Sequence, residues 1–216
     1  VETYDDIQIL KDKSSNLFFR IIKKDGTVLE YGSTLGDNPQ TDGIIKLKEN
    51  TTTPFMWRLK KVTDNNGNYI EYKYGQFEGE SWVTEINYTG NTTLAPPCKI
   101  QFLYGTREDP AKLYFAGYEM RVQHILTGIK VYYNTQFVRE YSLKYNKTAD
   151  DIYTRLVEVQ EIGTNQKKYN STLIQWGNKA ATFQSDVIKN GRYVFVEGYK
   201  YYPGDFNGDG RTDLVY

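Results

Sequence analysis

The chain has 216 residues, and its 27 Lys and Arg balance 27 Asp and Glu, so the formal net charge is zero. A neutral chain lacks the long-range attraction to nucleic acid or anionic lipid that a basic domain has, and no apolar run is long enough to span a bilayer. The single cysteine, Cys98, excludes an internal disulfide and a cysteine-based zinc cluster. The first residues lack an initiator Met and the regions of a signal peptide, so we expect a processed or trimmed piece of a longer protein.

Aromatic residues dominate the apolar part of the composition, with 20 Tyr, 10 Phe and 3 Trp. Such side chains suit a pleated, half-buried surface, and no long stretch has apolar residues spaced for a helix face. The composition therefore predicts an all-β fold, an antiparallel meander of long β-hairpins.

Turn signals and alternation locate these hairpins along the chain. Asp25-Gly26 separates IIKK from VLEY, and Asn66-Gly67 in DNNGN is a pair favoured in tight hairpins. In NYIEYKY (68–74), Ile70, Tyr72 and Tyr74 share one face, and the same alternation runs through KIQFLY (99–104) and VREYSLKY (138–145). This period predicts strands with one packed face and one wet face.

A weak internal repeat accompanies the strands. Four segments share an Arg or Trp, then Leu or Val, then Val or Ile three residues later: RLKKV (58–62), WVTEI (82–86), RVQHI (121–125) and RLVEV (155–159). Their spacing is irregular, which argues against a rigid solenoid and fits long hairpins added side by side.

The composition changes near Trp176-Gly177. Residues 178–190 show no clean alternation, and strand character returns afterwards. We therefore expect a β-hairpin domain over 1–177, a linker over 178–190 and the truncated start of a second module over 191–216.

That last segment ends in an acidic loop, GDFNGDGRTDLVY (204–216). Alternate carboxylate and amide side chains in a tight turn supply the oxygens that Ca²⁺ prefers, and Gly210 permits the bend. The expected ligands are Asp205, Asn207, Asp209, the carbonyl of Arg211, and Asp213. Tyr216 replaces the bidentate Glu of an EF-hand and no helix pattern flanks the loop, so we expect a structural β-hairpin calcium loop. The alternative is an Asx-rich turn that holds no ion.

These motifs resemble known families. GDFNGDGRTDLVY resembles the FG-GAP/VCBS repeat, a calcium-clipped element of β-propeller blades. RLKKVTDNNGNYIEYKY resembles the Rhs/YD repeat. The order of the strand motifs, followed by the acidic repeat, is similar to the N-terminal region of SpvB-like proteins and to the B component of insecticidal toxin complexes.

The resemblance implies a structural role. In these families β-hairpins build a hollow shell around a toxic polypeptide, and FG-GAP repeats form a propeller that docks to the translocation component. Residues 1–177 are then a strip of shell or a related scaffold in a secreted or cell-surface bacterial protein. Its partners are other segments of the same Rhs/toxin-type polypeptide or toxin-complex subunits. The chain is too short for a closed shell, and no region resembles the ADP-ribosyltransferase of SpvB, so no toxin activity is transferred to it.

The residues offer little for catalysis, and we predict that the chain is not an enzyme. His124 is the only histidine and lies in a probable strand, while Cys98 is expected to be a small buried apolar residue. We expect the paired acids to lie solvated in turn-like stretches: Asp5–Asp6, Glu78–Glu80, Glu108–Asp109 and Asp150–Asp151.

The main rival is a carbohydrate-binding module that uses exposed Trp and Tyr, with Trp57, Trp82 and Trp176 as candidates. The alternation instead predicts that these aromatics fill a sheet face. A scaffold segment predicts a free sheet edge or apolar face that promotes self-association. Sugar binding that is lost on mutation of one exposed Trp would favour the rival.

Overall fold

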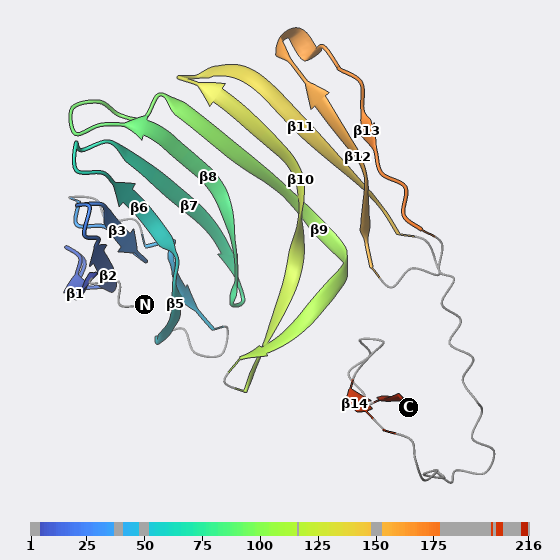
Figure 1. Ribbon diagram of the computed structural model, residues 1–216, viewed down its shortest axis with the longest axis horizontal. Coiled ribbons are helices and arrows are strands. Elements are labelled where there is room, and N and C mark those ends of the chain that lie inside the picture. The colour runs from blue at the N-terminus through green and yellow to red at the C-terminus, as the bar shows by residue number, and fades with distance from the viewer. Residues whose placement is uncertain are drawn as a thin grey trace. The chain divides into compact units, whose positions relative to one another are not determined.

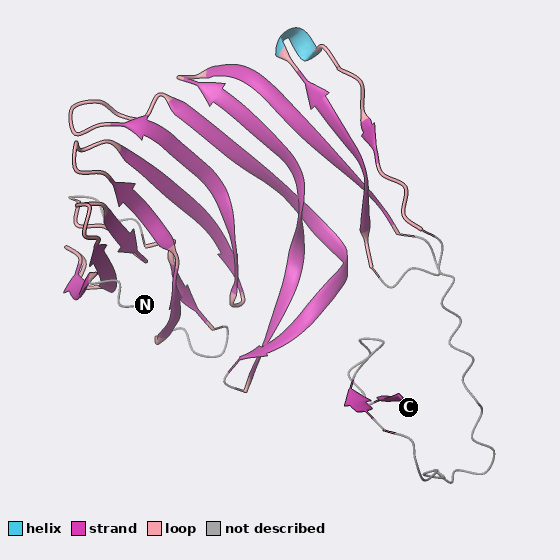
Figure 2. Cartoon of the chain, viewed as in Figure 1, coloured by secondary structure: helices cyan, strands magenta, loops and turns pink. Residues whose placement is uncertain are grey.

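A computed structural model describes residues 5–36, 41–47, 52–115, 117–147, 153–177, 200 and 202–204, together with the backbone of 213–215. The chain divides into two compact units, Val1–Trp176 and Gly177–Tyr216. In the described residues the helical structure is a single 3-10 turn, Thr164–Gln166, and strands form the rest of the regular structure (Figure 2). The all-β prediction is confirmed.

Unit Val1–Trp176 is built around an eleven-stranded antiparallel sheet in which strands follow one another in chain order (Figure 1). Between β3 and β6 the chain leaves this sheet to form a separate hairpin of β4 (Ile44–Lys46) and β5 (Pro54–Trp57). The strands of the sheet, in spatial order, are β1 (Asp6–Lys11), β2 (Leu17–Ile22), β3 (Val28–Tyr31), β6 (Leu59–Thr63), β7 (Tyr69–Phe77), β8 (Glu80–Gly90), β9 (Cys98–Phe115), β10 (Tyr118–Tyr133), β11 (Gln136–Asn146), β12 (Arg155–Ile162) and β13 (Thr172–Leu173). The predicted meander of long hairpins is confirmed.

Three hairpins use one connection, over 12–16, 23–27 and 64–68. In each, the N–H of the first residue donates to the carbonyl of the fifth, at 2.8 to 2.9 Å. The fourth residue has positive φ: Ser15 at 66°, Gly26 at 84° and Gly67 at 83°. This is a three-residue loop whose last position is left-handed, so glycine favours it. The predicted hairpins at Asp25-Gly26 and Asn66-Gly67 are confirmed, but their loops are one residue longer than the tightest turn.

The four repeat segments occupy equivalent places in the sheet. They fall in β6, β8, β10 and β12, with the first residue of the first segment, Arg58, just before β6. In an antiparallel meander these alternate strands run in the same direction. The repeated sequence pattern therefore marks every second strand of the meander, from β6 to β12.

The register sorts side chains into an apolar and a charged face. Ile21, Leu29, Val62 and Ile70 stand opposite one another across β2, β3, β6 and β7. Their immediate neighbours, Arg20, Glu30, Lys61 and Glu71, form a parallel row on the other face. Further along, Ile86 faces Ile100, which faces Val131. The two-faced alternation predicted for these strands is therefore confirmed, but the expected packed face is not: every residue of β7, β9 and β11 is half-buried or exposed.

The buried core is small and lies at one end of the sheet. The buried apolar side chains of the described residues are Phe18, Ile44, Ile45 and Leu47, which belong to β2, β4 and the residue after β4. Throughout β7–β12, by contrast, no apolar side chain is buried, and the residues that are buried as a whole are two glycines, Gly90 and Gly128. Figure 1 shows these strands as one curved layer. The segment around the β4–β5 hairpin contacts it at β7, through Asp42 and Tyr74, and at the end of β9, through Phe55 and Phe115.

The β9–β10 hairpin is the longest and bends out of the regular sheet (Figure 1). Its register shifts twice, between Val122 and His124 and between Leu126 and Gly128, and such bulges bend a strand. The tip reaches β5, where the rings of Phe55 and Phe115 lie 5.1 Å apart. The hairpin thus connects the sheet to the small β4–β5 hairpin.

Candidate functional site

Four carboxylates tie together parts of unit Val1–Trp176 that are far apart in the sequence. They belong to Asp12, Asp42, Glu80 and Asp109, and each accepts backbone N–H groups as well as side-chain donors. A buried N–H without a partner costs about 1–3 kcal/mol. These carboxylates therefore satisfy donors that a bulged, single-layer sheet leaves unpaired.

Asp12 joins the β1–β2 turn to the chain after β3. Its Oδ1 accepts the N–H groups of Ser14 and Asn16, both at 2.9 Å, and its Oδ2 accepts the hydroxyl of Ser33 at 2.7 Å. Burial opposes ionisation of this carboxyl, but the hydrogen bonds, that from Ser33 first, leave its pKa below the ordinary value. The turn is thereby fixed against the segment that leads out to β4.

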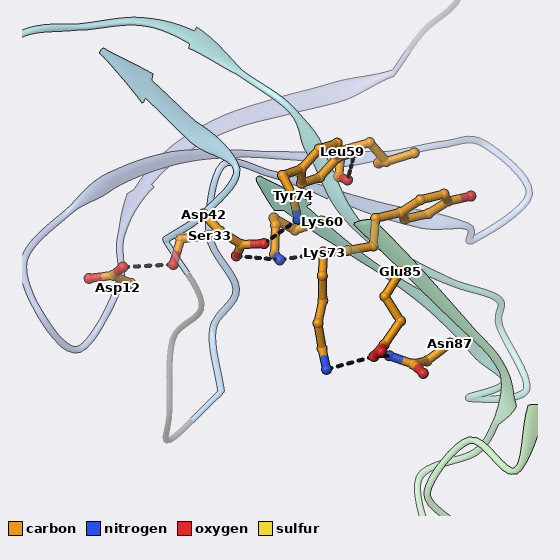
Figure 3. A network of polar contacts seen from close by, with 10 residues as sticks. Asp12, Ser33, Asp42, Leu59, Lys60, Lys73, Tyr74, Glu85 and Asn87 are labelled. Carbon is orange, nitrogen blue, oxygen red and sulfur yellow. Dashed lines mark hydrogen bonds and ion pairs between the residues drawn. The ribbon is translucent and has the colours of Figure 1, made fainter. Parts of the chain in front are cut away.

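Asp42 and Lys60 form the centre of the second tie (Figure 3). The Lys60 side chain is 3% exposed, and its Nζ donates to Asp42 Oδ1 and to the Tyr72 carbonyl, each at 2.6 Å. Asp42 Oδ2 accepts the N–H of Tyr74 at 2.6 Å, where the β7–β8 register shifts between Lys73 and Tyr74. Burial lowers the pKa of Lys60, and Asp42 offsets part of this effect.

Tyr74 closes the same network. Its hydroxyl donates to the Leu59 carbonyl at 2.6 Å, and burial raises its pKa to about 12. Because the folded pKa lies above the unfolded value of 10.0, the contribution of Tyr74 to folding stability is lost as the pH rises from about 10 to about 12. We expect a spectrophotometric titration to show a tyrosine step near pH 12 that Tyr74→Phe removes. An unchanged titration curve in Tyr74→Phe would contradict this assignment.

Glu80 forms the third tie, to a histidine two strands away. Its side chain is 8% exposed and accepts the N–H groups of Gln123 and His124 at 3.0 and 3.2 Å. Nδ1 of His124 lies 2.9 Å from Glu80 Oε2, and Trp82 stacks on the imidazole with ring centroids 3.9 Å apart. The carboxylate thus binds the backbone of β10 at the first register shift of the long hairpin, where β9 carries the extra residues.

Glycine makes room for this cluster. A Cβ at Gly75 would lie 2.5 Å from Cε2 of Trp82, so the indole lies directly over the backbone of β7. Trp82 is therefore held between Gly75 and the His124 ring, and it belongs to the packing of the bend.

Asp109 forms the fourth tie, between β9 and the residue that precedes β12. Its side chain is 8% exposed. It accepts the N–H and the hydroxyl of Thr154 at 2.6 and 2.7 Å, and Nε of Arg107 at 2.9 Å. Burial opposes ionisation, yet the bonds from Thr154 and Arg107 lower the pKa of this carboxyl to about 2.

The expectation that the paired acids are solvated is wrong for Glu80 and Asp109. Both lie beside bulges or strand ends whose unpaired N–H groups draw a carboxylate inward. Asp6 and Glu108 are exposed as expected, Asp5 and Glu78 are half-buried, and Asp150 and Asp151 lie outside the described residues. No local pattern indicates the partners of Glu80 and Asp109, because His124 and Thr154 are more than forty residues away from them along the chain.

The other single candidates take ordinary sheet positions. Cys98 begins β9 as expected but is half-buried rather than buried. Trp57 donates to the Leu17 carbonyl at 3.0 Å and packs edge-on to Phe19. Trp176 is 52% exposed, and its indole donates to the Leu156 carbonyl at 2.7 Å. Of the three tryptophans proposed for sugar stacking, Trp176 is thus the most open to solvent.

The predicted calcium loop can be followed only at its ends. β14 (Tyr202–Gly204) pairs antiparallel with β15 (Asp213–Val215), and Gly204 stands opposite Asp213. Asp205, Asn207, Asp209 and Arg211 lie outside the described residues, as do residues 178–190 of the predicted linker and all but the backbone of Asp213. Among described side chains, no group of three His, Cys, Asp or Glu is placed to hold a metal. The calcium site and the three-part division therefore remain predictions.

Comparison with known proteins places the fold. No protein-family model matches the chain, and no curated protein matches its sequence. The N-terminal domain of the effector SpvB from Salmonella typhimurium superposes with a TM-score of 0.61 at 14% identity, over 76% of this chain and 66% of that one. None of the helices in the described part of the chain is long and apolar enough to cross a bilayer.

Two toxin-complex structures give the same score of 0.61 at 16% identity over 80% of this chain. One is the crystal structure of TcdB2–TccC3–Cdc42, and the other is the Photorhabdus luminescens Tc holotoxin pore with a TccC3 mutation. The chain spans 11% and 10% of the matched chains, and under two thirds of the SpvB domain. It therefore shares its β-sheet fold with part of the SpvB N-terminal domain and with a short part of chains in Tc toxin complexes.

Proposed function

We propose that this chain is a non-catalytic β-scaffold segment, a strip of wall, in a secreted or cell-surface bacterial protein of the Rhs or toxin-complex type. The observation that carries the proposal is the absence of buried apolar side chains from β7–β12, within the part of the chain that the structure describes. A soluble domain normally buries one face of such a sheet. In a wall segment, this face is instead covered by neighbouring segments or lines an enclosed space.

The ties described above suit this role. A layer without a core gains little stability from apolar burial, so its curvature has to be held by polar contacts at the bends. Asp42 binds at the β7–β8 register shift, Glu80 at the first β9–β10 register shift, and Asp109 at the residue before β12. Their oxygens are engaged with the backbone, which supports a structural role for these acids.

The sheet also has two edges at which the scaffold can continue. β1 and β13 are its terminal strands, and Ile7 and Ile9 of β1 are each 64% exposed. An open edge with apolar side chains pairs readily with another strand. The partners proposed here are other segments of the same Rhs/toxin-type polypeptide or partner toxin-complex subunits. We propose no nucleic-acid partner and no membrane-spanning segment.

Self-association of the isolated chain tests the proposal. We expect concentration-dependent oligomers in sedimentation velocity, because the apolar face and the β1 edge are uncovered. Phe102→Lys places a charge on the apolar face and should weaken association about tenfold, the effect of about 1.4 kcal/mol of lost apolar burial. Gln101→Lys, on the opposite face of the same strand, should leave association unchanged. A chain that stays monomeric at all concentrations would contradict the wall role.

We also propose that the acidic loop binds Ca²⁺ through Asp205, Asn207, Asp209, the Arg211 carbonyl and Asp213. Extracellular modules of this kind bind at about 0.1–1 mM, so titration calorimetry with millimolar Ca²⁺ should show one site. Asp209→Ala should weaken binding at least about tenfold through loss of a charged ligand, whereas Asp6→Ala should not. Equal heats from the Asp209→Ala variant and the unmodified chain would show that the loop is an ion-free turn.

A further inference from the structure

The open edge of β1 carries two apolar side chains that continue rows of the sheet. β1 is a terminal strand, and among the described strands β2 alone pairs with it. Ile7 stands opposite Ile21 and Ile9 opposite Phe19, so both isoleucines belong to the apolar face. Each is 64% exposed. Two apolar rows of the sheet therefore end at this edge largely uncovered by the described residues.

The hydrogen-bonding pattern shows which backbone groups of β1 point outward. The N–H of Asp12 donates to the carbonyl of Asn16 across the β1–β2 turn, at 2.9 Å. In an antiparallel ladder such bonded pairs recur at every second residue, so the even-numbered residues of β1 direct their backbone groups toward β2. The backbone groups of Ile7, Ile9 and Lys11 therefore point away from the sheet, where they can pair with an added strand without disturbing β2.

The sequence of β1 is complementary to itself in one antiparallel register. Opposite residues must share a face, because a slip of one residue moves every side chain to the other face. One allowed register sets Ile7 of each copy against Ile9 of the other, and Asp5 against Lys11. A shift of two residues in either direction would instead set Asp5 against Ile9, or Ile7 against Lys11. Apolar and charge complementarity therefore select the same register.

The opposite edge of the sheet suits a second copy less well. β13 comprises only Thr172–Leu173. As the first and last of eleven antiparallel strands, β1 and β13 run in the same direction. A head-to-tail contact would therefore pair them in parallel over two residues, whereas two β1 strands pair antiparallel over the six residues of each strand.

We propose that two copies of this chain form a symmetric dimer through their β1 strands, with Gln8 of each copy opposite Gln8 of the other at the two-fold axis. Ile7 and Ile9 exchange backbone hydrogen bonds between the copies, and Asp5 meets Lys11 at each end. The two apolar faces then lie on the same side, so the layer continues across the dimer. This inference rests on the proposed scaffold function for its open edge, and it names the partner that covers that edge.

Cysteine cross-linking of the whole chain tests the register, in a Cys98→Ser background that leaves no other thiol. Opposite residues whose backbone groups point away from each other bring their side chains close enough for a disulfide. Gln8→Cys should therefore form a covalent dimer on mild oxidation, read by non-reducing electrophoresis. Asp6→Cys and Leu10→Cys should not cross-link alone, since like residues lie about 13 Å apart along the strands, but a mixture of the two should.

Sedimentation velocity separates this dimer from stacking of the apolar faces. In the Phe102→Lys variant, which weakens that stacking, the remaining association should stop at a dimer. Adding Ile9→Pro should weaken this dimer at least about tenfold, because proline removes an outward N–H and leaves the bonds to β2 in place. Thermal melting confirms that each variant is folded.

The outcomes separate the dimer from the scaffold role. The dimer is overturned if Gln8→Cys gives no covalent dimer, or if Asp6→Cys alone cross-links as readily as Gln8→Cys. It is also overturned, while the scaffold role stands, if the unmodified chain associates and Phe102→Lys alone makes it monomeric at all concentrations. An unmodified chain that never associates would contradict both proposals.

Discussion

Replacing Asp109 by alanine is expected to destabilise the unit Val1–Trp176 by about 3 kcal/mol, the usual cost of removing one partner from a buried charged network. The variant leaves the N–H and hydroxyl of Thr154 and the Nε of Arg107 without their acceptor. These donors join β9 to the start of β12, so the loss acts on the outer part of the sheet. Urea denaturation followed by tryptophan fluorescence measures the change.

The neighbouring Glu108 supplies the control, because it is exposed and Glu108→Ala should change stability by no more than about 0.5 kcal/mol. The pH dependence gives a second reading. The folded pKa of Asp109 is about 2 against an ordinary 3.8, so its stabilisation is complete above about pH 4 and is lost as the pH falls toward 2. Asp109→Ala should flatten this part of the acid-unfolding curve. Equal stability of the Asp109→Ala and Glu108→Ala variants would contradict a stabilising role for the Asp109 contacts.

Replacing Glu80 by alanine is expected to cost about 2–3 kcal/mol and to loosen β10 at its first register shift with β9, because two backbone N–H groups and the imidazole lose their acceptor. Amide hydrogen exchange should quicken at Gln123 and His124 and stay unchanged in β11. Stability is measured by urea denaturation, and exchange by mass spectrometry.

Two comparisons isolate this effect. Glu119→Ala removes a surface ion pair with Arg121 at the tip of the same hairpin and should cost less than about 1 kcal/mol. A double-mutant cycle of Glu80→Ala with His124→Ala should give a positive coupling energy. Additive effects of the two substitutions would show that the contact at 2.9 Å contributes nothing to the bend.

Local signals were sufficient to predict the fold class. Alternation in NYIEYKY, KIQFLY and VREYSLKY follows directly from the pleat, since successive side chains point to opposite faces. Asn66-Gly67 and Asp25-Gly26 mark hairpins because the left-handed position of the loop favours glycine. The resemblance to SpvB and toxin-complex proteins, drawn from the order of these motifs, agrees with the structural comparison at the level of fold.

The ties and the core depend on contacts that local patterns do not encode. The hydrogen bonds of Glu80 to His124 and of Asp109 to Thr154 arise because bulges bring distant strands together and leave N–H groups unpaired. Acids in polar, turn-like stretches are usually solvated, which explains why the prediction was wrong for Glu80 and Asp109. The buried residues Ile44, Ile45 and Leu47 lie in a short hairpin that shows no extended alternation.

The bulges, too, could not be predicted from local sequence patterns. At the first register shift of the long hairpin, one residue of β10, Gln123, stands against four residues of β9, 107–110, and the β10 segment, RVQHI, matches the other repeats. Extra residues in one strand redirect the chain, and nothing in this repeat segment marks them. The bend, and with it the environment of His124 and Trp82, therefore emerges only from the assembled sheet.

Carbene footprinting of the chain as a dilute monomer tests the central claim most directly, because it labels side chains in proportion to their exposure. If β7–β12 form a single uncovered layer, Phe102, Ile129 and Tyr141 on the apolar face should be labelled nearly as strongly as Gln101 and Lys130 on the charged face, and far more than the buried Phe18 and Ile45. Labelling of Phe102 and Ile129 as weak as that of Phe18 would contradict the claim, because it would mean that another layer covers the sheet.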